Sequence, residues 1–365
     1  MSAITPTNTN PPFGLKLQTF LIQNGLLGLI LAINVGGILL NLFGSRPYVL
    51  VAYASLRLLT PGGLLGSGKT PDNGSWRRFS EKLFFPAEIM RRYLELSFAK
   101  LPKELVNAEA EENARFVFCA FPHGCNSDFR ALMDGILGEV LPNLIQRDSV
   151  RSLAASILFK IPILREICLW TGCIDASRKY AEMALDQQKS LLILPGGEAE
   201  QIMTTYGREK VYLSRRKGFV KLAMRKGVPV VPIYVFGVSD SYYTFHDNGK
   251  NSDNKKKFDW SFYNLRHKLM KNFGICIVIC TGLWGSWLCP LPKKTTIVFG
   301  KPIWFRPSGK SSPDNDSTNE QSSSAFEPTS EELDKGHALF VKELTALFDE
   351  HKTRLGYGDR TLEVI

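Results

Sequence analysis

The first of the chain's five histidines, His123, lies at the end of an apolar run and before a segment with helical spacing. Pro122 and Gly124 flank it, so a strand, a sharp turn and a helix are predicted in succession. In α/β sheets, ligands and catalytic groups gather in such turns, at the carboxyl ends of strands. His123 is therefore a candidate general base. The alternative is a structural histidine whose ring nitrogens are hydrogen-bonded to the local backbone.

Asp128, further along the same segment, is the candidate partner of that histidine. On one continuous helix the two side chains would point about 140° apart, since successive residues turn by roughly 100°. They meet only if His123 lies in the turn and Asp128 in the first helical turn. Asp128 would then accept a hydrogen bond from one imidazole nitrogen and leave the other as the base. By itself this spacing favours the alternative by about two to one.

Three later segments carry residue types that suit the same chemistry. GCIDASR, Gly172–Arg178, places an arginine after a turn, and LPGGEAEQI, Leu194–Ile202, places two glycines and two carboxylates after a strand. VPVVPI, Val228–Ile233, is strand-like, but Pro229 and Pro232 cannot donate to a ladder, which predicts an edge strand or a bulge. Each segment is a weak signal separately, and their order along the chain makes a pattern.

From about Phe84 the chain alternates between strand-like and helix-like patterns, which predicts an α/β fold with a mixed, mainly parallel sheet flanked by helices. The last helix has Thr329 or Ser330 as its cap. Before it, residues 306–328 are rich in Ser, Asn, Pro and Asp and predict a solvated insert. The predicted strands are Ala114–Phe121, Ser190–Pro195, Val228–Phe236 and Thr295–Ile303, and the predicted helices are Asp128–Val140, Arg215–Lys226 and the segment containing Leu333, Phe340, Leu344, Leu347 and Phe348.

The N-terminal region is strongly apolar. Phe20–Phe43 contains no charged residue and is long enough for a membrane-spanning helix, whereas the next apolar run, Tyr48–Leu59, is too short to span comfortably alone. The pair predicts one span plus an interfacial helix, or a hairpin in one leaflet, and a buried core helix is the alternative. Another apolar segment, Phe273–Pro292, is explained by two strands and a turn, although Trp284 and Trp287 also suit a bilayer interface.

Charge and cysteine content limit the class of partner. Lys and Arg number 45 against 35 Asp and Glu, a net charge of +10, which suggests nucleic acid, lipid headgroups or a phosphorylated cofactor as partner. Nucleic acid is the weakest of these, because the basic residues are dispersed without a recognised module. The seven cysteines show no paired spacing for zinc, so no metal site is predicted and the thiols are interpreted as reduced.

In chain order, His-x4-Asp, Gly-x5-Arg, Pro-Gly-Gly with a following Glu, and Val-Pro-x-x-Pro resemble the four blocks of glycerolipid acyltransferases. The type-2 diacylglycerol acyltransferase family is the closer resemblance, and it runs from about Phe84 to Tyr357. Two departures are present: the family commonly has His or Glu where this chain has Phe121, and Asp128 is not a usual feature of it. The resemblance rests on PHG at Pro122–Gly124, PGGEAE at Pro195–Glu200, RRKGFVKLAMRKGVPVVPIYVFG at Arg215–Gly237 and FGKPI at Phe299–Ile303.

The resemblance implies an acyl-CoA-dependent O-acyltransferase that converts diacylglycerol to triacylglycerol by direct attack, with His123 as base and no bound cofactor besides the acyl-CoA co-substrate. Asp128 and Glu200 are the other catalytic candidates, with a helix-cap carboxylate as the alternative for Glu200. The predicted oxyanion and CoA-phosphate ligands are Gly124, Gly196 and Gly197 for the oxyanion, and Arg178, Arg215, Arg216, Lys217 and Lys221 for the phosphates.

The implied organisation is an N-terminal tail (1–19), a membrane anchor (20–59) and an acyltransferase domain (60–365). The anchor implies the endoplasmic reticulum membrane and lipid droplets, with the catalytic domain facing the cytosol and in contact with membrane lipids. A homo-oligomer is left open. Monoacylglycerol, a long-chain alcohol or a lysophospholipid are alternative acceptors, and a non-catalytic lipid-binding scaffold is the alternative from another class.

Overall fold

The computed structural model describes residues 10–42, 87–146, 150–162, 164–244, 262–273, 276–305 and 326–365. Within them, seven strands form one sheet in the order β1-β10-β7-β2-β5-β3-β4. The five strands from β7 to β4 run parallel, β10 is antiparallel to β7, and β1 is parallel to β10. The predicted mixed, mainly parallel sheet is confirmed. Its strands are β1 Ser97–Phe98, β2 Val117–Phe121, β3 Val150–Ala154, β4 Cys173–Asp175, β5 Ser190–Ile193, β7 Val230–Phe236 and β10 Thr296–Phe299.

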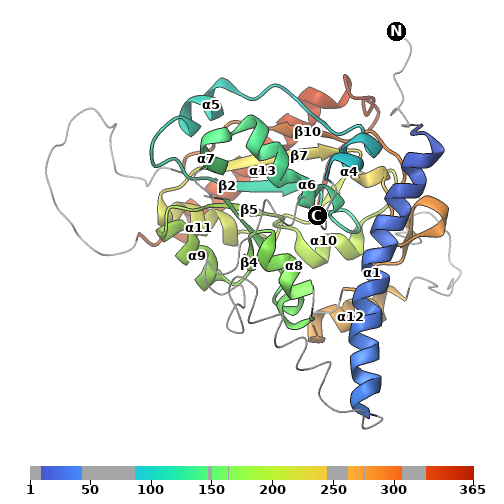
Figure 1. Cartoon of the computed structure of the whole chain (residues 1–365). Helices are drawn as coiled ribbons and strands as arrows, with labels where there is room; N and C mark the ends of the chain where they lie inside the picture. Colours follow the sequence, from blue (N-terminus) through green and yellow to red (C-terminus); the bar gives the residue numbers. More distant parts are fainter. Residues whose placement is uncertain are drawn as a thin grey trace, which may run out of the picture.

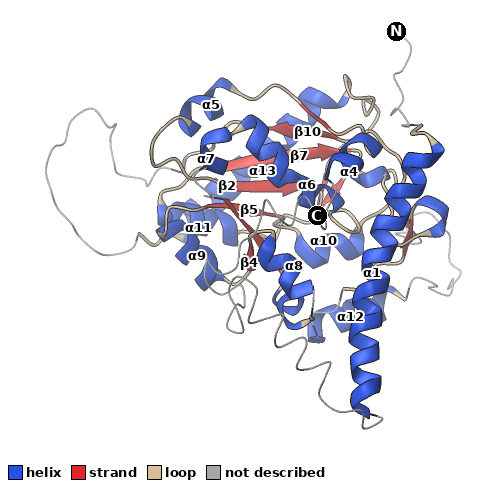
Figure 2. Cartoon of the chain, in the orientation of Figure 1, coloured by secondary structure: helices blue, strands red, loops and turns tan. Residues whose placement is uncertain are grey.

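Helices cover both faces of this sheet (Figure 1; Figure 2). Side chains of β2 alternate between two buried clusters, as the two-residue period of a strand requires: Val117 and Cys119 enter one, and Phe118 and Ala120 the other. The first cluster packs against α9 Arg178–Asp186, α11 Gly218–Lys226 and α13 Ser330–Lys352, and the second against α5 Lys103–Glu109, α6 Asp128–Val140 and α7 Pro142–Gln146.

Shorter elements connect these layers. Two small sheets pair β6 Lys210–Val211 with β11 Glu363–Val364, and β8 Tyr243–Thr244 with β9 Cys280–Thr281. The remaining helices and turns are α1 Phe13–Leu42, α4 Ala87–Tyr93, η2 Ser156–Lys160, α8 Leu164–Trp170, α10 Gly197–Met203, η3 Val238–Asp240, α12 Tyr263–Phe273 and η4 Leu283–Gly285.

Of the two alternatives predicted for strand β7, the edge position is excluded, because β7 lies between β10 and β2, and the bulge is confirmed. The lost donor of Pro232 is tolerated where the neighbouring chain leaves the regular ladder. Between the pairs Ile233–Phe299 and Val230–Ile303, β7 has two residues and its neighbour has three, which is a bulge. Gly300 lies in the bulge, and a Cβ atom there would lie 2.6 Å from the Pro232 ring, so the glycine makes room for the proline.

The C-terminal helix α13 begins as predicted. Thr329 Oγ1 accepts a hydrogen bond from Glu332 N (3.2 Å), and Glu332 Oε2 accepts one from Thr329 N (2.9 Å), which completes a capping box. Phe340, Leu344 and Phe348 are buried against the sheet. The periodicity of this segment therefore identified both the start of the helix and its buried side.

Helix α1 runs along one side of the domain and projects beyond it (Figure 1). Its first part contacts the domain, where Ser286 Oγ donates to Asn24 Oδ1 (2.7 Å). Within the described part of the chain, no helix is both long enough and apolar enough to cross a membrane. The second arm of the predicted hairpin, 48–59, lies outside the described residues, as do 306–325 of the predicted insert. The membrane anchor stays a prediction.

The segment Phe273–Pro292 does not form the predicted two strands and a turn. It contains only the short strand β9 and the turn η4 among its described residues. Its backbone is held by local bonds instead: Gly282 N donates to Ser286 O (2.6 Å), and Ser286 Oγ accepts from Leu288 N (3.1 Å) and Cys289 N (3.0 Å). The hydroxyl of Ser286 therefore satisfies two backbone donors of this turn.

Candidate active site

The loop between β2 and α6 carries His123 and is tied to Glu200 of α10. His123 N donates a hydrogen bond to Glu200 Oε1, and Tyr212 N donates to Glu200 Oε2 (2.7 Å). The Glu200 side chain is 3% exposed. One buried carboxylate therefore joins the backbone of the histidine loop to the segment that leads into α11.

Strand order explains why these segments meet. Strands β2 and β5 pair in parallel, with Cys119 opposite Ile193, so the loops that follow them leave the sheet at the same edge. At the end of β5, Gly197 has a φ of 54°, in the left-handed region that favours glycine. A Cβ atom on Gly196 would overlap the Glu200 carboxylate. Both glycines of the PGGE segment are thus needed to fold this carboxylate back toward His123.

The imidazole of His123 is neutral at physiological pH. Burial lowers the pKa of His123 to about 4, and the nearby Arg130 charge acts in the same direction. Nδ1 lies 3.1 Å from Gly124 O and 2.9 Å from Ser127 Oγ. A carbonyl oxygen can only accept, so the proton of the neutral ring is assigned to Nδ1 and the lone pair to Nε2. Nε2 is therefore unprotonated at physiological pH, and its lone pair is available.

Burial also raises the pKa of Glu200, to about 7, against the two backbone N–H donors and the Arg216 charge that lower it. Its contact with His123 is through the main-chain N–H and not through the ring. Glu200 thus holds the histidine loop in place and does not itself polarise the imidazole.

Asp128 is the first residue of α6, in the first helical turn as predicted. Its side chain lies outside the described part of the structure, so the His123–Asp128 dyad stays a prediction.

The five predicted phosphate ligands fall into two groups. Arg216 lies beside the candidate site: its Nη2 donates to Gly196 O (3.2 Å), and its guanidinium lies 5.2 Å from the centre of the Tyr212 ring. Arg215 is exposed. The other three are in ion pairs, Arg178 with Glu182 (2.8 Å), Lys217 with Asp334 (2.5 Å) and Lys221 with Glu327. A substrate phosphate would have to compete with those carboxylates.

The predicted oxyanion ligands also differ in their surroundings. Gly197 N donates to Leu194 O (3.0 Å), so this N–H already closes a turn. Gly124 adjoins His123 and has a φ of 69°. A Cβ atom on Gly124 would lie 2.5 Å from Val238 Cγ1, so the loop packs closely on η3. Of these glycines, Gly124 is the one directly beside the base.

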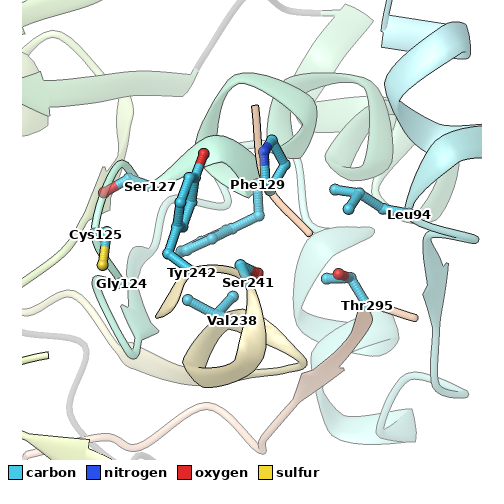
Figure 3. Close-up of a pocket in the computed structure, with 10 residues that line it drawn as sticks. Leu94, Gly124, Cys125, Ser127, Phe129, Val238, Ser241, Tyr242 and Thr295 are labelled. Atoms are coloured by element: carbon cyan, nitrogen blue, oxygen red, sulfur yellow. The ribbon is translucent and has the colours of Figure 1, made fainter. Parts of the chain in front are cut away.

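A small pocket, partly open to solvent, lies beside the histidine loop (Figure 3). Gly124 and Ser127 line it from the loop, and Ser241 and Tyr242 from the segment after η3. Sequence reasoning missed these last two and Tyr212. Their position depends on pairing between distant strands, and no motif marks them in the sequence.

Among the described residues, the cysteines and other metal-binding side chains form no further centre. The seven cysteines are free thiols, and all but Cys276 are buried. In the part of the chain that the structure describes, no three His, Cys, Asp or Glu side chains form a group that could hold a metal ion.

Fold and site together define an α/β protein with a neutral histidine at the carboxyl end of a central strand. The chain belongs to the diacylglycerol acyltransferase family, whose model matches residues 87–365. It is an acyltransferase, and the family predicted from the sequence blocks is confirmed.

Individual relatives agree with the family. A diacylglycerol O-acyltransferase 2 of Danio rerio is 28% identical over 315 residues, which cover 83% of this chain and 77% of the relative. A 2-acylglycerol O-acyltransferase 3 of Homo sapiens is 30% identical over 273 residues, 70% of each chain. A diacylglycerol O-acyltransferase 1 of Eremothecium gossypii is 32% identical over 210 residues, which cover 57% of this chain and only 41% of that relative.

Proposed function

We propose that the protein transfers the acyl group of acyl-CoA to the free hydroxyl of diacylglycerol, with His123 as the general base. The observation that carries this proposal is the neutral imidazole of His123, with its proton on Nδ1 and its lone pair on Nε2, at the carboxyl end of β2. The matched family and the names of the relatives support the substrate class.

In the proposed reaction, His123 Nε2 takes the proton of the acceptor hydroxyl as its oxygen attacks the thioester carbon. The tetrahedral intermediate then breaks its C–S bond, and the leaving thiolate receives the proton from the imidazolium. A C–O bond forms, a C–S bond breaks and the base is restored, so no covalent enzyme intermediate is required. A backbone N–H in the turn at Gly124 is the proposed donor to the oxyanion, because glycine allows close approach.

Arg216 is the proposed ligand of a CoA phosphate. Its Nε is buried and has no hydrogen-bond partner among the described residues, and it forms no ion pair there. An arginine that forms no direct ion pair can bind phosphate without first breaking one. Replacement of Arg216 by Ala should raise the KM for acyl-CoA about tenfold, whereas Lys221→Ala, which removes a lysine already paired with Glu327, should change it less than twofold. Equal effects of the two changes would contradict this assignment.

The proposal includes binding at the endoplasmic reticulum membrane or lipid droplets, with the catalytic domain facing the cytosol. Phe13, Trp284 and Trp287 support it, since they are 70%, 50% and 70% exposed on one side of the domain. The Trp284 ring lies 5.8 Å from that of Phe13, and Asn126 Nδ2 donates to Trp287 O (2.6 Å), which connects this aromatic surface to the histidine loop. Replacing both tryptophans by Ser should reduce sedimentation with phosphatidylcholine vesicles, and unchanged sedimentation would contradict a role for this surface.

A second acceptor is favoured by one finding: the relative from Homo sapiens is a 2-acylglycerol O-acyltransferase. Long-chain alcohols, lysophospholipids and a non-catalytic scaffold have no comparable support. The acceptor is therefore identified by assaying acyl transfer to diacylglycerol, monoacylglycerol and a long-chain alcohol with the same preparation.

The experiment uses the full chain in detergent with radiolabelled oleoyl-CoA and each acceptor. Labelled triacylglycerol should form, and His123→Ala should abolish it. His351→Ala, on α13, is the matched control and should retain activity. Full activity of His123→Ala would overturn the proposal. Transfer to monoacylglycerol alone would mean that the acceptor is monoacylglycerol and not diacylglycerol.

A further inference from the structure

Ser127 has an unusual backbone conformation for its residue type. It lies between β2 and α6 with φ 53° and ψ 37°, in the left-handed region that residues other than glycine seldom adopt. Such conformations persist only where surrounding interactions hold them, and they gather at functional sites. Ser127 also lines the pocket beside the histidine loop (Figure 3).

The Ser127 hydroxyl is in contact with the histidine at three points. It donates to His123 O (3.0 Å) and lies 2.9 Å from Nδ1 and 3.3 Å from Nε2. A hydroxyl has a single proton, and the carbonyl of His123 can only accept. With that proton committed to the carbonyl, Oγ faces the ring as an acceptor. With the ring proton on Nδ1, this N–H faces both Oγ and Gly124 O, and the 3.3 Å contact between Oγ and Nε2 carries no proton.

We propose that Ser127 is a positioning residue that fixes the ring orientation and tautomer of His123, so that Nε2 presents its lone pair to the acceptor hydroxyl. This inference rests on the proposed role of His123 as base. The left-handed backbone is what turns the Ser127 side chain back onto the preceding loop. A serine in the turn thereby adds a second acceptor beside Gly124 O for Nδ1–H, in the place that a neighbouring carboxylate takes in many histidine bases.

The same contacts define a rival role. A serine hydroxyl near a histidine nitrogen is also the arrangement of an acyl-accepting nucleophile. Attack on acyl-CoA would form an ester on Ser127 Oγ and release the CoA thiol. The bond from Oγ to His123 O opposes this role, because it directs the hydroxyl proton away from Nε2.

The test compares Ser127→Ala, Ser127→Gly and, as a control on an exposed turn, Ser156→Ala, all in the full chain. Both Ser127 variants should lose roughly tenfold in kcat, as expected for one hydrogen bond, with KM for acyl-CoA and diacylglycerol within about twofold of wild type. Ser127→Gly should have the higher Tm of the two, because glycine tolerates the left-handed backbone. The control should match wild type in kcat and Tm.

Three outcomes would overturn the inference. Wild-type kcat in Ser127→Gly would mean that only the backbone matters. A rise in KM with unchanged kcat would indicate a substrate contact. The third is an acyl ester on Ser127, detected by peptide mass analysis after incubation with labelled acyl-CoA in the absence of acceptor, which would establish the rival role. His123→Ala assayed in parallel separates the two proposals: if it is active, the proposed base fails, whereas an inactive His123→Ala with fully active Ser127 variants refutes only the positioning role.

Discussion

Replacing Glu200 by Gln tests how the histidine loop is held. The carboxylate accepts Tyr212 N at 2.7 Å on one oxygen and His123 N on the other. At pH 5 Glu200 is protonated, but both of its oxygens keep lone pairs that can accept. A glutamine has only one acceptor oxygen, so its NH2 group would face one of these two N–H donors. A buried donor without a partner costs about 1–3 kcal/mol, and we expect Glu200→Gln to be about 2 kcal/mol less stable at pH 5.

The difference should depend on pH, because burial raises the pKa of Glu200 from 4.5 to about 7. A raised pKa in the folded state gives a stability contribution that is fully present below pH 4.5 and is lost as the pH rises through about 7. The loss amounts to about 3 kcal/mol by pH 8. Glutamine does not titrate, so the gap between wild type and Glu200→Gln should close or reverse between pH 5 and pH 8.

Denaturation in guanidinium chloride at pH 5, 6, 7 and 8 measures this gap in the free energy of unfolding. Glu198→Gln is the control, since it removes the same charge two residues away at a half-buried position, and its effect should stay within about 0.5 kcal/mol. The kcat of Glu200→Gln should fall at every pH, because the histidine loop loses an anchor. A gap independent of pH would refute the raised pKa, and an unchanged kcat would refute the anchoring.

Three further predictions concern other parts of the chain. In a Glu200→Gln background, acyl transfer should stay constant from pH 8 to 5.5, because the pKa of His123 is about 4; a loss of activity centred near 6.5 would contradict this. Arg360→Leu leaves the buried carboxylates of Glu209 and Asp240 without their positive partner. It should lower the free energy of unfolding by about 3–5 kcal/mol, against about 0.5 kcal/mol for the exposed Arg354→Leu. Gly300→Ala should cost about 1–3 kcal/mol by overpacking the proline ring of β7, and a Tm equal to wild type would disprove that contact.

Local patterns predicted the elements better than the arrangement of the elements. Helix α6 has the predicted bounds, Asp128–Val140, and α11 ends before Gly227, which has a φ of 60°. These features depend on periodicity and on the backbone preferences of single residues. The prolines of β7 predicted an edge strand or a bulge without deciding between them, because the cost of Pro232 depends on the neighbouring strand; the bulge at Gly300 removes that cost in a central strand.

In the candidate site, too, local features were predicted and contacts between distant segments were not. His123 was found because a histidine between Pro and Gly at the end of a strand is visible in the sequence. Its contact with Glu200 spans 77 residues and exists because β5 pairs with β2, so periodicity alone does not reveal it. Ser127 was missed because a serine before a helix is usually a cap, whereas here the helix cap bond is absent and the hydroxyl faces the histidine.

The basic residues before and within α11 show why residue type alone overpredicts a phosphate site. Lys217 and Lys221 follow Arg216 in one basic segment, and the sequence treats them alike. In the fold, Lys217 pairs with Asp334 of α13 and Lys221 with Glu327 just before it, so both connect two packed parts of the chain. Arg216 lies against Gly196 instead, beside the carboxylate that holds His123. A phosphate bound by Arg216 would break no ion pair, whereas one bound by either lysine would first have to separate α11 from its partner.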